Sequence, residues 1–102
     1  MFEFVRDHLS EEELLAQLAE EASELAHAAL KLRRALDGRN PTPVPVEEAR
    51  AGLNEEVADV MLCLQVLNIS PHSQDINGPK YRKLDRWIGR LLQRDREGPH
   101  HG

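Results

Sequence analysis

The sequence contains little of what would mark a secreted, membrane-spanning or aromatic-rich protein. Its 102 residues include one cysteine, Cys63, which excludes an internal disulfide framework and favours a reducing cytoplasm. No run approaches the roughly 18 apolar residues of a membrane span, and the N-terminus is too polar for a signal peptide. Only four residues are aromatic: Phe2, Phe4, Tyr81 and Trp87. We therefore expect a single cytoplasmic domain whose core consists mainly of leucine, valine and alanine.

The net charge of −5 conceals a difference between the two ends of the chain. Residues 1–78 carry 15 acidic and 6 basic side chains, whereas residues 79–102 carry 3 acidic and 7 basic ones. Non-specific binding to nucleic acid relies on positive charge, so a globally acidic chain is a poor candidate for it. We expect neither a nucleic acid nor a membrane as the partner.

Capping and turn residues predict three helices, at about residues 10–36, 46–69 and 80–96. Ser10 and Glu13 form a capping box at the start of the first helix, and Gly38 provides a stop just beyond its end. Prolines at positions 41, 43 and 45 make the connector to the second helix stiff and irregular.

The remaining segments are expected to be irregular: a short N-terminal lead, a loop over residues 70–79 and a disordered tail over residues 97–102. No segment has the alternating pattern typical of a strand. The predicted fold class is all-α: an antiparallel helical hairpin plus a third helix, forming one domain over residues 1–102 of an oligomeric helical bundle.

Apolar residues recur at spacings of three and four in each predicted helix, the pattern of a bundle. The predicted stripes are Leu18, Ala22, Leu25, Ala29, Leu32 and Leu36, then Leu53, Val57, Val60, Leu64 and Leu67, then Tyr81, Leu84, Ile88 and Leu91. Three stripes on a short chain leave apolar surface exposed in a monomer, which predicts a homodimer or homotetramer.

Two acidic segments of similar sequence, LAEEASEL and LNEEVADV, lie 35 residues apart in the first and second predicted helices. The repeat aligns Glu21 with Glu56 and Glu24 with Asp59. At about 100° per residue, each pair lies on the same flank of its apolar stripe. In an antiparallel hairpin, equal phase places both pairs on the same side, so the four carboxylates are expected to converge.

Four converging carboxylates repel one another, by several kcal/mol in a low dielectric, and a divalent cation relieves that repulsion. Carboxylate oxygens suit Mg²⁺, Mn²⁺ or Ca²⁺, and Mg²⁺ typically takes further ligands from water and phosphate. A single E-x-x-E usually marks a solvated helix face, but two copies in equal phase favour a metal site. Glu20 and Glu55, nearly opposite the stripes, are expected to face water.

An E-x-x-E on one helix and an E-x-x-D on the next, in EEASEL and NEEVADV, resemble the MazG-like, all-α nucleoside triphosphate pyrophosphohydrolases. The resemblance covers about residues 10–90. It implies Mg²⁺-dependent cleavage of an NTP or dNTP between the α- and β-phosphates, with Mn²⁺ as a substitute, in order to clean, control or (in phage) reshape the nucleotide pool. Relatives are dimers or tetramers, and many have a fourth helix and more aromatic residues around the base. Carried over to this chain, the metal ligands are Glu21, Glu24, Glu56 and Asp59.

Further residues are assigned roles from their positions. Phosphoanhydride cleavage needs charge neutralisation and a positioned water, and Glu21, nearest the apolar stripe, is the predicted general base. Lys80, Lys83 and Asn77, near the start of the third predicted helix, are the expected ligands of the phosphates. Gln17 lies one turn before Glu21 and is expected to touch the base or sugar.

Two alternatives remain open at this point. The first is a non-enzymatic helical interaction module whose acidic face binds a basic partner, which predicts no dependence on Mg²⁺. The second is a related all-α enzyme that acts on a phosphoribosyl nucleotide or a dUTP-like substrate. Glu24 and His27 also have the E-x-x-H spacing of di-iron bundles, but the second helix has Leu62 at the equivalent position.

Overall fold

The computed structural model describes residues 1–38 and 44–98, and over these residues it is all-helical, with no strand. The helices are α1 (Phe2–His8), α2 (Glu11–Asp37), α3 (Val46–Val66) and α4 (Gln74–Arg96). The chain divides into two compact units, Met1–Ile69 and Ser70–Gly102. The predicted all-α class is confirmed. Within the described ranges, no helix combines the length and apolar character needed to cross a bilayer.

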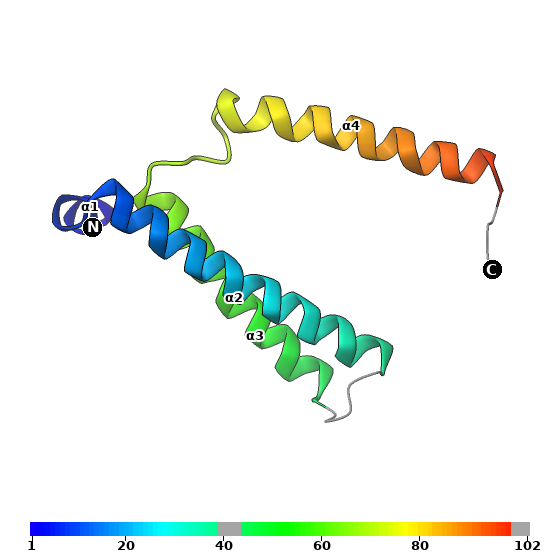
Figure 1. Ribbon diagram of the computed structural model, residues 1–102, viewed down its shortest axis with the longest axis horizontal. Coiled ribbons are helices and arrows are strands. Elements are labelled where there is room, and N and C mark those ends of the chain that lie inside the picture. The colour runs from blue at the N-terminus through cyan, green and yellow to red at the C-terminus, as the bar shows by residue number, and fades with distance from the viewer. Residues whose placement is uncertain (39–43, 99–102) are drawn as a thin grey trace. The chain divides into compact units, whose positions relative to one another are not determined.

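Helices α2 and α3 pack side by side as the predicted antiparallel hairpin (Figure 1). Ser10 caps α2, since its Oγ accepts a hydrogen bond from the Glu13 backbone N–H at 3.1 Å. Gly38 ends α2 with φ 72°, a left-handed conformation that costs glycine little. Pro45 is the N-cap of α3, whereas Pro41 and Pro43 of the predicted connector lie outside the described residues.

Relative to the first two predicted stripes, the seam of the hairpin is shifted toward the carboxylate flank on both helices. Seven of the eleven predicted stripe residues remain in the seam. Ala22, Ala29, Leu36 and Val57, four predicted seam residues, are exposed instead. The buried and half-buried residues along the seam include Leu14, Leu18, Glu21, Leu25, Ala28, Leu32 and Ala35 in α2. In α3 they include Ala49, Gly52, Leu53, Glu56, Val60, Cys63, Leu64 and Val66, followed by the C-cap Leu67.

Small side chains occupy part of the observed seam. Ala28 and Ala35 of α2 and Ala49 of α3 occupy seam positions, and Gly52 is half-buried beside them. Because interaxial distance depends on the side chains at the contact, these positions let the helices approach closely. The prediction weighed hydrophobicity alone, and so it placed Glu21 and Glu56 on the flank rather than in the seam.

The predicted N-terminal lead is a helix, α1, which packs against α3. Seven residues are too few for a stable isolated helix, so tertiary contacts stabilise it. The Arg6 Nε–H donates to the Val66 carbonyl at 2.7 Å, and the Phe4 and His8 rings stack with centroids 4.1 Å apart. Local signals for this helix are weak, because it has seven residues and its N-cap, Met1, forms no side-chain capping hydrogen bond.

The boundaries of the other helices also differ from prediction. Helix α3 ends at Val66 rather than residue 69, because Asn68 adopts a left-handed conformation with φ 63°. Helix α4 begins at Gln74 rather than residue 80, with Ser73 as N-cap and Pro79 inside the helix. Pro79 falls in the second turn, where it removes a single backbone hydrogen bond. Helix α4 ends at Arg96, as predicted, with Glu97 as its C-cap. Residues 99–102 of the predicted tail lie outside the described residues.

Candidate metal centre

Glu21 and Glu56 lie in the middle of the hairpin seam, one on each helix, and both are half-buried. One carboxylate oxygen from each, together with one from the exposed Asp59, can lie within 4.8 Å of one another. Three oxygens at this separation can coordinate one small divalent cation. The structure therefore brings together three of the four predicted metal ligands.

The fourth predicted ligand, Glu24, is exposed and lies near Glu56 without joining the three-residue cluster. Partial burial raises the pKa of the Glu56 carboxyl, and the negative charges of Asp59, Glu24 and Glu21 raise it further. Glu55, expected to face water, is exposed but adds a smaller contribution to the same shift. The effect on Glu56 indicates that all four predicted carboxylates share one electrostatic environment.

Gln17 is held against the cluster. Its Nε2–H donates to Glu21 Oε1 at 2.8 Å, across one turn of α2. This hydrogen bond orients the Glu21 carboxylate and leaves Oε2 available to another partner. Sequence reasoning placed Gln17 on the flank of Glu21 as a ligand of base or sugar; the structure places it there as a hydrogen-bond partner of Glu21.

An apolar pocket of about 440 Å³ opens on one side of the carboxylates, between α1, α2 and α3. Glu21 and Asp59 form its polar edge, together with Gln17. Its apolar walls include Phe2, Val5, Leu14, Leu62, Cys63 and Val66. The volume falls within the range of small-molecule sites. Helix α1, missed from the sequence, thus supplies one wall of a pocket beside the candidate metal site.

A polar pocket of about 390 Å³ opens on the other side of the carboxylates, further along the same two helices. Glu24 and Glu56 lie at its edge. Its other charged and ionisable side chains are His27, Lys31, Arg34 and Glu48. Lys31 and Arg34 were not singled out from the sequence; they follow Glu24 by seven and ten residues, about two and nearly three turns further along α2.

Cys63 lies on the apolar side of the cluster and is half-buried. Burial raises the pKa of its thiol, and the charges of Glu21 and Asp59 raise it further. The thiol is therefore protonated at neutral pH and is not poised to act as a thiolate nucleophile.

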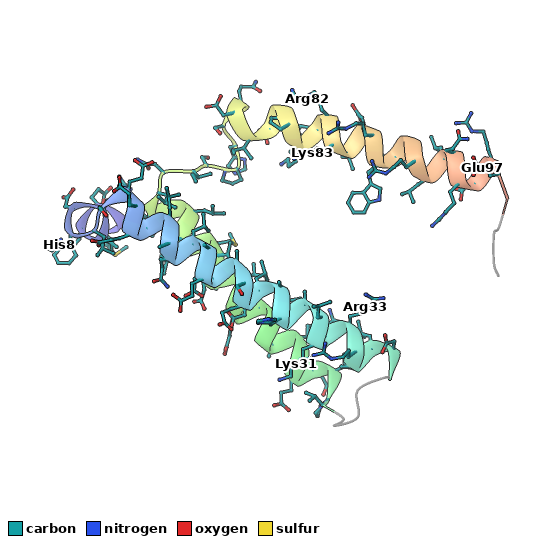
Figure 2. The ribbon with its side chains drawn as sticks, viewed as in Figure 1. His8, Lys31, Arg33, Arg82, Lys83 and Glu97 are labelled. Atoms are coloured by element: carbon teal, nitrogen blue, oxygen red, sulfur yellow. The ribbon has the colours of Figure 1, made fainter. Side chains whose placement is uncertain are left out.

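The predicted phosphate ligands Asn77, Lys80 and Lys83 lie on α4, in the second unit, and their role stays a prediction. Lys80 and Lys83 are exposed, and Lys80 Nζ lies 5.1 Å from the centroid of the Tyr81 ring, a cation–π contact. Figure 2 shows the position of Lys83 on this helix.

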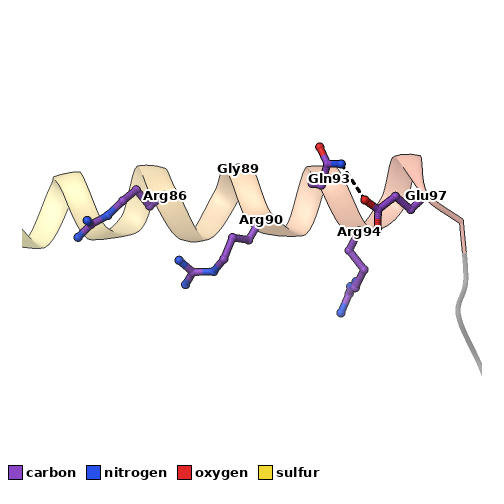
Figure 3. A pocket seen from close by; sticks show the side chains of 6 residues that line it. All are labelled: Arg86, Gly89, Arg90, Gln93, Arg94 and Glu97. Atoms are coloured by element: carbon purple, nitrogen blue, oxygen red, sulfur yellow. Dashed lines mark hydrogen bonds between the residues drawn. The ribbon is translucent and has the colours of Figure 1, made fainter.

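Three arginines line a shallow pocket of about 470 Å³ on the polar face of α4, around Gly89 (Figure 3). They are Arg86, Arg90 and Arg94, which follow at intervals of one helical turn. At the edge of this pocket the Gln93 amide donates to Glu97 Oε1 at 2.7 Å. The pocket belongs to one helix surface and contains no carboxylate cluster among the described residues.

Comparisons with protein-family models, with curated proteins and with solved structures give no match for this chain. The resemblance to the MazG-like family therefore rests on the paired acidic motif of the sequence alone.

Proposed function

We propose that the chain is a divalent-metal-dependent hydrolase that cleaves a nucleoside or deoxynucleoside triphosphate between the α- and β-phosphates. The products are a nucleoside monophosphate and pyrophosphate. The observation that carries the proposal is the meeting of Glu21, Glu56 and Asp59 from facing helices, with ligand oxygens within 4.8 Å of one another. The choice of reaction comes from the resemblance of the paired acidic motif to the MazG-like family. The neighbouring apolar pocket offers space for a nucleobase.

In this proposal Glu21, Glu24, Glu56 and Asp59 hold Mg²⁺, or Mn²⁺ in its place. The bound cation would neutralise phosphate charge and polarise the α-phosphate. Glu21 takes a proton from a water as the water oxygen attacks the α-phosphorus, and the bond to the bridging oxygen of pyrophosphate breaks. Gln17 holds Glu21 in a fixed orientation through the 2.8 Å hydrogen bond, which keeps the base aligned with that water.

Hydrolysis of a panel of NTPs and dNTPs in the presence of Mg²⁺ tests this function. We expect a monophosphate and pyrophosphate from at least one member of the panel, and no turnover in EDTA. Release of orthophosphate instead would contradict cleavage between the α- and β-phosphates. Activity on a phosphoribosyl nucleotide alone would favour the related enzyme, and no turnover on any substrate would favour an acidic interaction module.

We also propose that the protein assembles as a homodimer or homotetramer. Large apolar side chains remain exposed in each unit, for example Leu36 at 60% in the first and Trp87 at 59% in the second. Burial of such side chains is the main driving force for association. Light scattering at micromolar concentration should therefore give at least twice the mass of the chain, and a stable monomer would contradict the assembly.

A further inference from the structure

We propose that the substrate lies along the hairpin with its base in the apolar pocket and its β- and γ-phosphates in the polar pocket, where Lys31 and Arg34 bind them. This assignment rests on the proposed function. It replaces Lys80 and Lys83 of α4 by two residues of α2 as the principal phosphate ligands.

The order of the two pockets along the helices supports this orientation. On α2, Gln17 and Glu21 line the apolar pocket, whereas Glu24, Lys31 and Arg34 line the polar one. On α3 the sequence runs in reverse, as an antiparallel helix requires: Asp59 and later residues line the apolar pocket, and Glu56 and earlier residues the polar one. The carboxylates therefore stand between an apolar site and a cationic site on a single path.

Lys31 and Arg34 are available to bind an anion. Both are exposed, and neither forms an ion pair within residues 1–38 and 44–98. Figure 2 shows Lys31 on the C-terminal half of α2. The guanidinium of arginine binds phosphate oxygens in pairs, and the ammonium of lysine acts as a point charge. His27 adds a further ring nitrogen to the same pocket.

The apolar pocket is unsuited to phosphate. Among the described residues, no lysine, arginine or histidine lines this pocket, and the α-amino group of Met1 at its rim already binds Glu3 at 2.9 Å. Arg6, a cationic side chain at this end of the hairpin, is already engaged, because its Nε–H donates to the Val66 carbonyl. The flat faces of a nucleobase fit walls of this kind, whereas a charged phosphate tail would lose its hydration there without compensation.

Glu48 opposes the two cations within the polar pocket. Its charge would repel the terminal phosphates, so the Glu48 side chain should affect nucleotide binding in the direction opposite to Lys31 and Arg34. Removal of Glu48 should therefore tighten nucleotide binding, while removal of Lys31 or Arg34 should weaken it.

Steady-state hydrolysis of the best substrate in the NTP and dNTP panel tests the assignment, with Lys31→Gln, Arg34→Gln and Glu48→Gln. Arg33→Gln is the matched control, because Arg33 is exposed and lines none of the pockets described above. We expect Lys31→Gln and Arg34→Gln each to raise KM at least about tenfold, as for loss of a charge-assisted hydrogen bond. Glu48→Gln should lower KM by about twofold, and Arg33→Gln should leave it unchanged.

Inorganic pyrophosphate provides a second readout. It should inhibit the wild type and raise its melting temperature in Mg²⁺, and both effects should weaken in Lys31→Gln and Arg34→Gln. Unchanged KM and unchanged pyrophosphate binding in these variants, with hydrolysis intact, would overturn the orientation but leave the proposed function standing. A rise in KM for Lys83→Gln alone would assign the phosphates to α4. A wild type that neither hydrolyses the panel nor binds Mg²⁺ would overturn both proposals.

Discussion

The two ends of the hairpin differ from its middle. The four buried residues of the described chain lie at the ends, with Leu14 and Val66 at one and Leu32 and Ala49 at the other. The middle of the same seam holds Glu21 and Glu56, whose carboxylates are half-buried and close together. The most completely buried apolar side chains thus lie at the two ends of the hairpin, and two acidic side chains interrupt the apolar seam between them.

The difference concerns stability: the ends of the seam are apolar, whereas its middle contains two acidic side chains. Leucine at positions 21 and 56 would continue the seam and contribute to the core, so the two glutamates lower the stability of the apo protein. Residues that reduce stability in this way are typical of functional sites. A bound cation would offset the repulsion between these carboxylates and so stabilise the middle of the hairpin.

The largest expected effect is on catalysis. Glu21→Gln, Glu24→Gln, Glu56→Gln and Asp59→Asn should each lower turnover at least about a hundredfold, because each removes a metal ligand or the base. Glu20→Gln and Glu55→Gln should change turnover little. Equal losses at all six positions would show that the position of a carboxylate relative to the seam has no importance.

The second effect separates the ends from the middle by stability. Leu32→Ala should lower the free energy of unfolding by about 2–4 kcal/mol, because Leu32 is only 7% exposed. Glu56→Gln should leave the apo protein as stable as the wild type, or slightly more so. Urea unfolding in EDTA measures both. A comparable loss of stability in the two variants would make Glu56 a structural residue.

The smallest effect is a pH dependence. Because the pKa of Glu56 is raised in the folded state, folding favours the protonated carboxyl. Its contribution to stability is therefore fully present below the ordinary pKa of about 4.5 and is lost as pH rises through the higher pKa of the folded state. Apo wild type should lose stability relative to Glu56→Gln over this interval. Parallel pH profiles of the two proteins would contradict the shared environment of the carboxylates.

Much of the fold could be predicted from local signals. Ser10, Glu13 and Gly38 set the ends of α2 through capping, which depends on neighbouring residues alone. The equal phase of the two acidic repeats correctly brought Glu21, Glu56 and Asp59 together, since the repeat fixes phase irrespective of the exact seam. Metal binding, catalysis and the phosphate-binding roles of Lys80 and Lys83 stay predictions.

The sequence could not give features that depend on tertiary contacts. Helix α1 is stabilised by α3, and the apolar pocket exists only where α1 meets the hairpin. The seam contains Ala28 rather than the predicted Ala29, and which of two neighbouring alanines lies in the contact depends on how the two helices fit together. Lys31 and Arg34 were not predicted because the pocket that they share with Glu24 and Glu56 forms only when α2 packs against α3.

Thermal unfolding in Mg²⁺ and in NaCl at matched ionic strength tests the metal site most directly, with wild type and Glu56→Gln compared. Only the folded arrangement binds the cation, so Mg²⁺ should stabilise the wild type by RT ln(1 + [L]/Kd), or about 2.7 kcal/mol at a hundredfold excess over Kd. Glu56→Gln should lose most of that response. Identical curves for the wild type in Mg²⁺ and NaCl, with and without a non-hydrolysable triphosphate, would contradict the metal site.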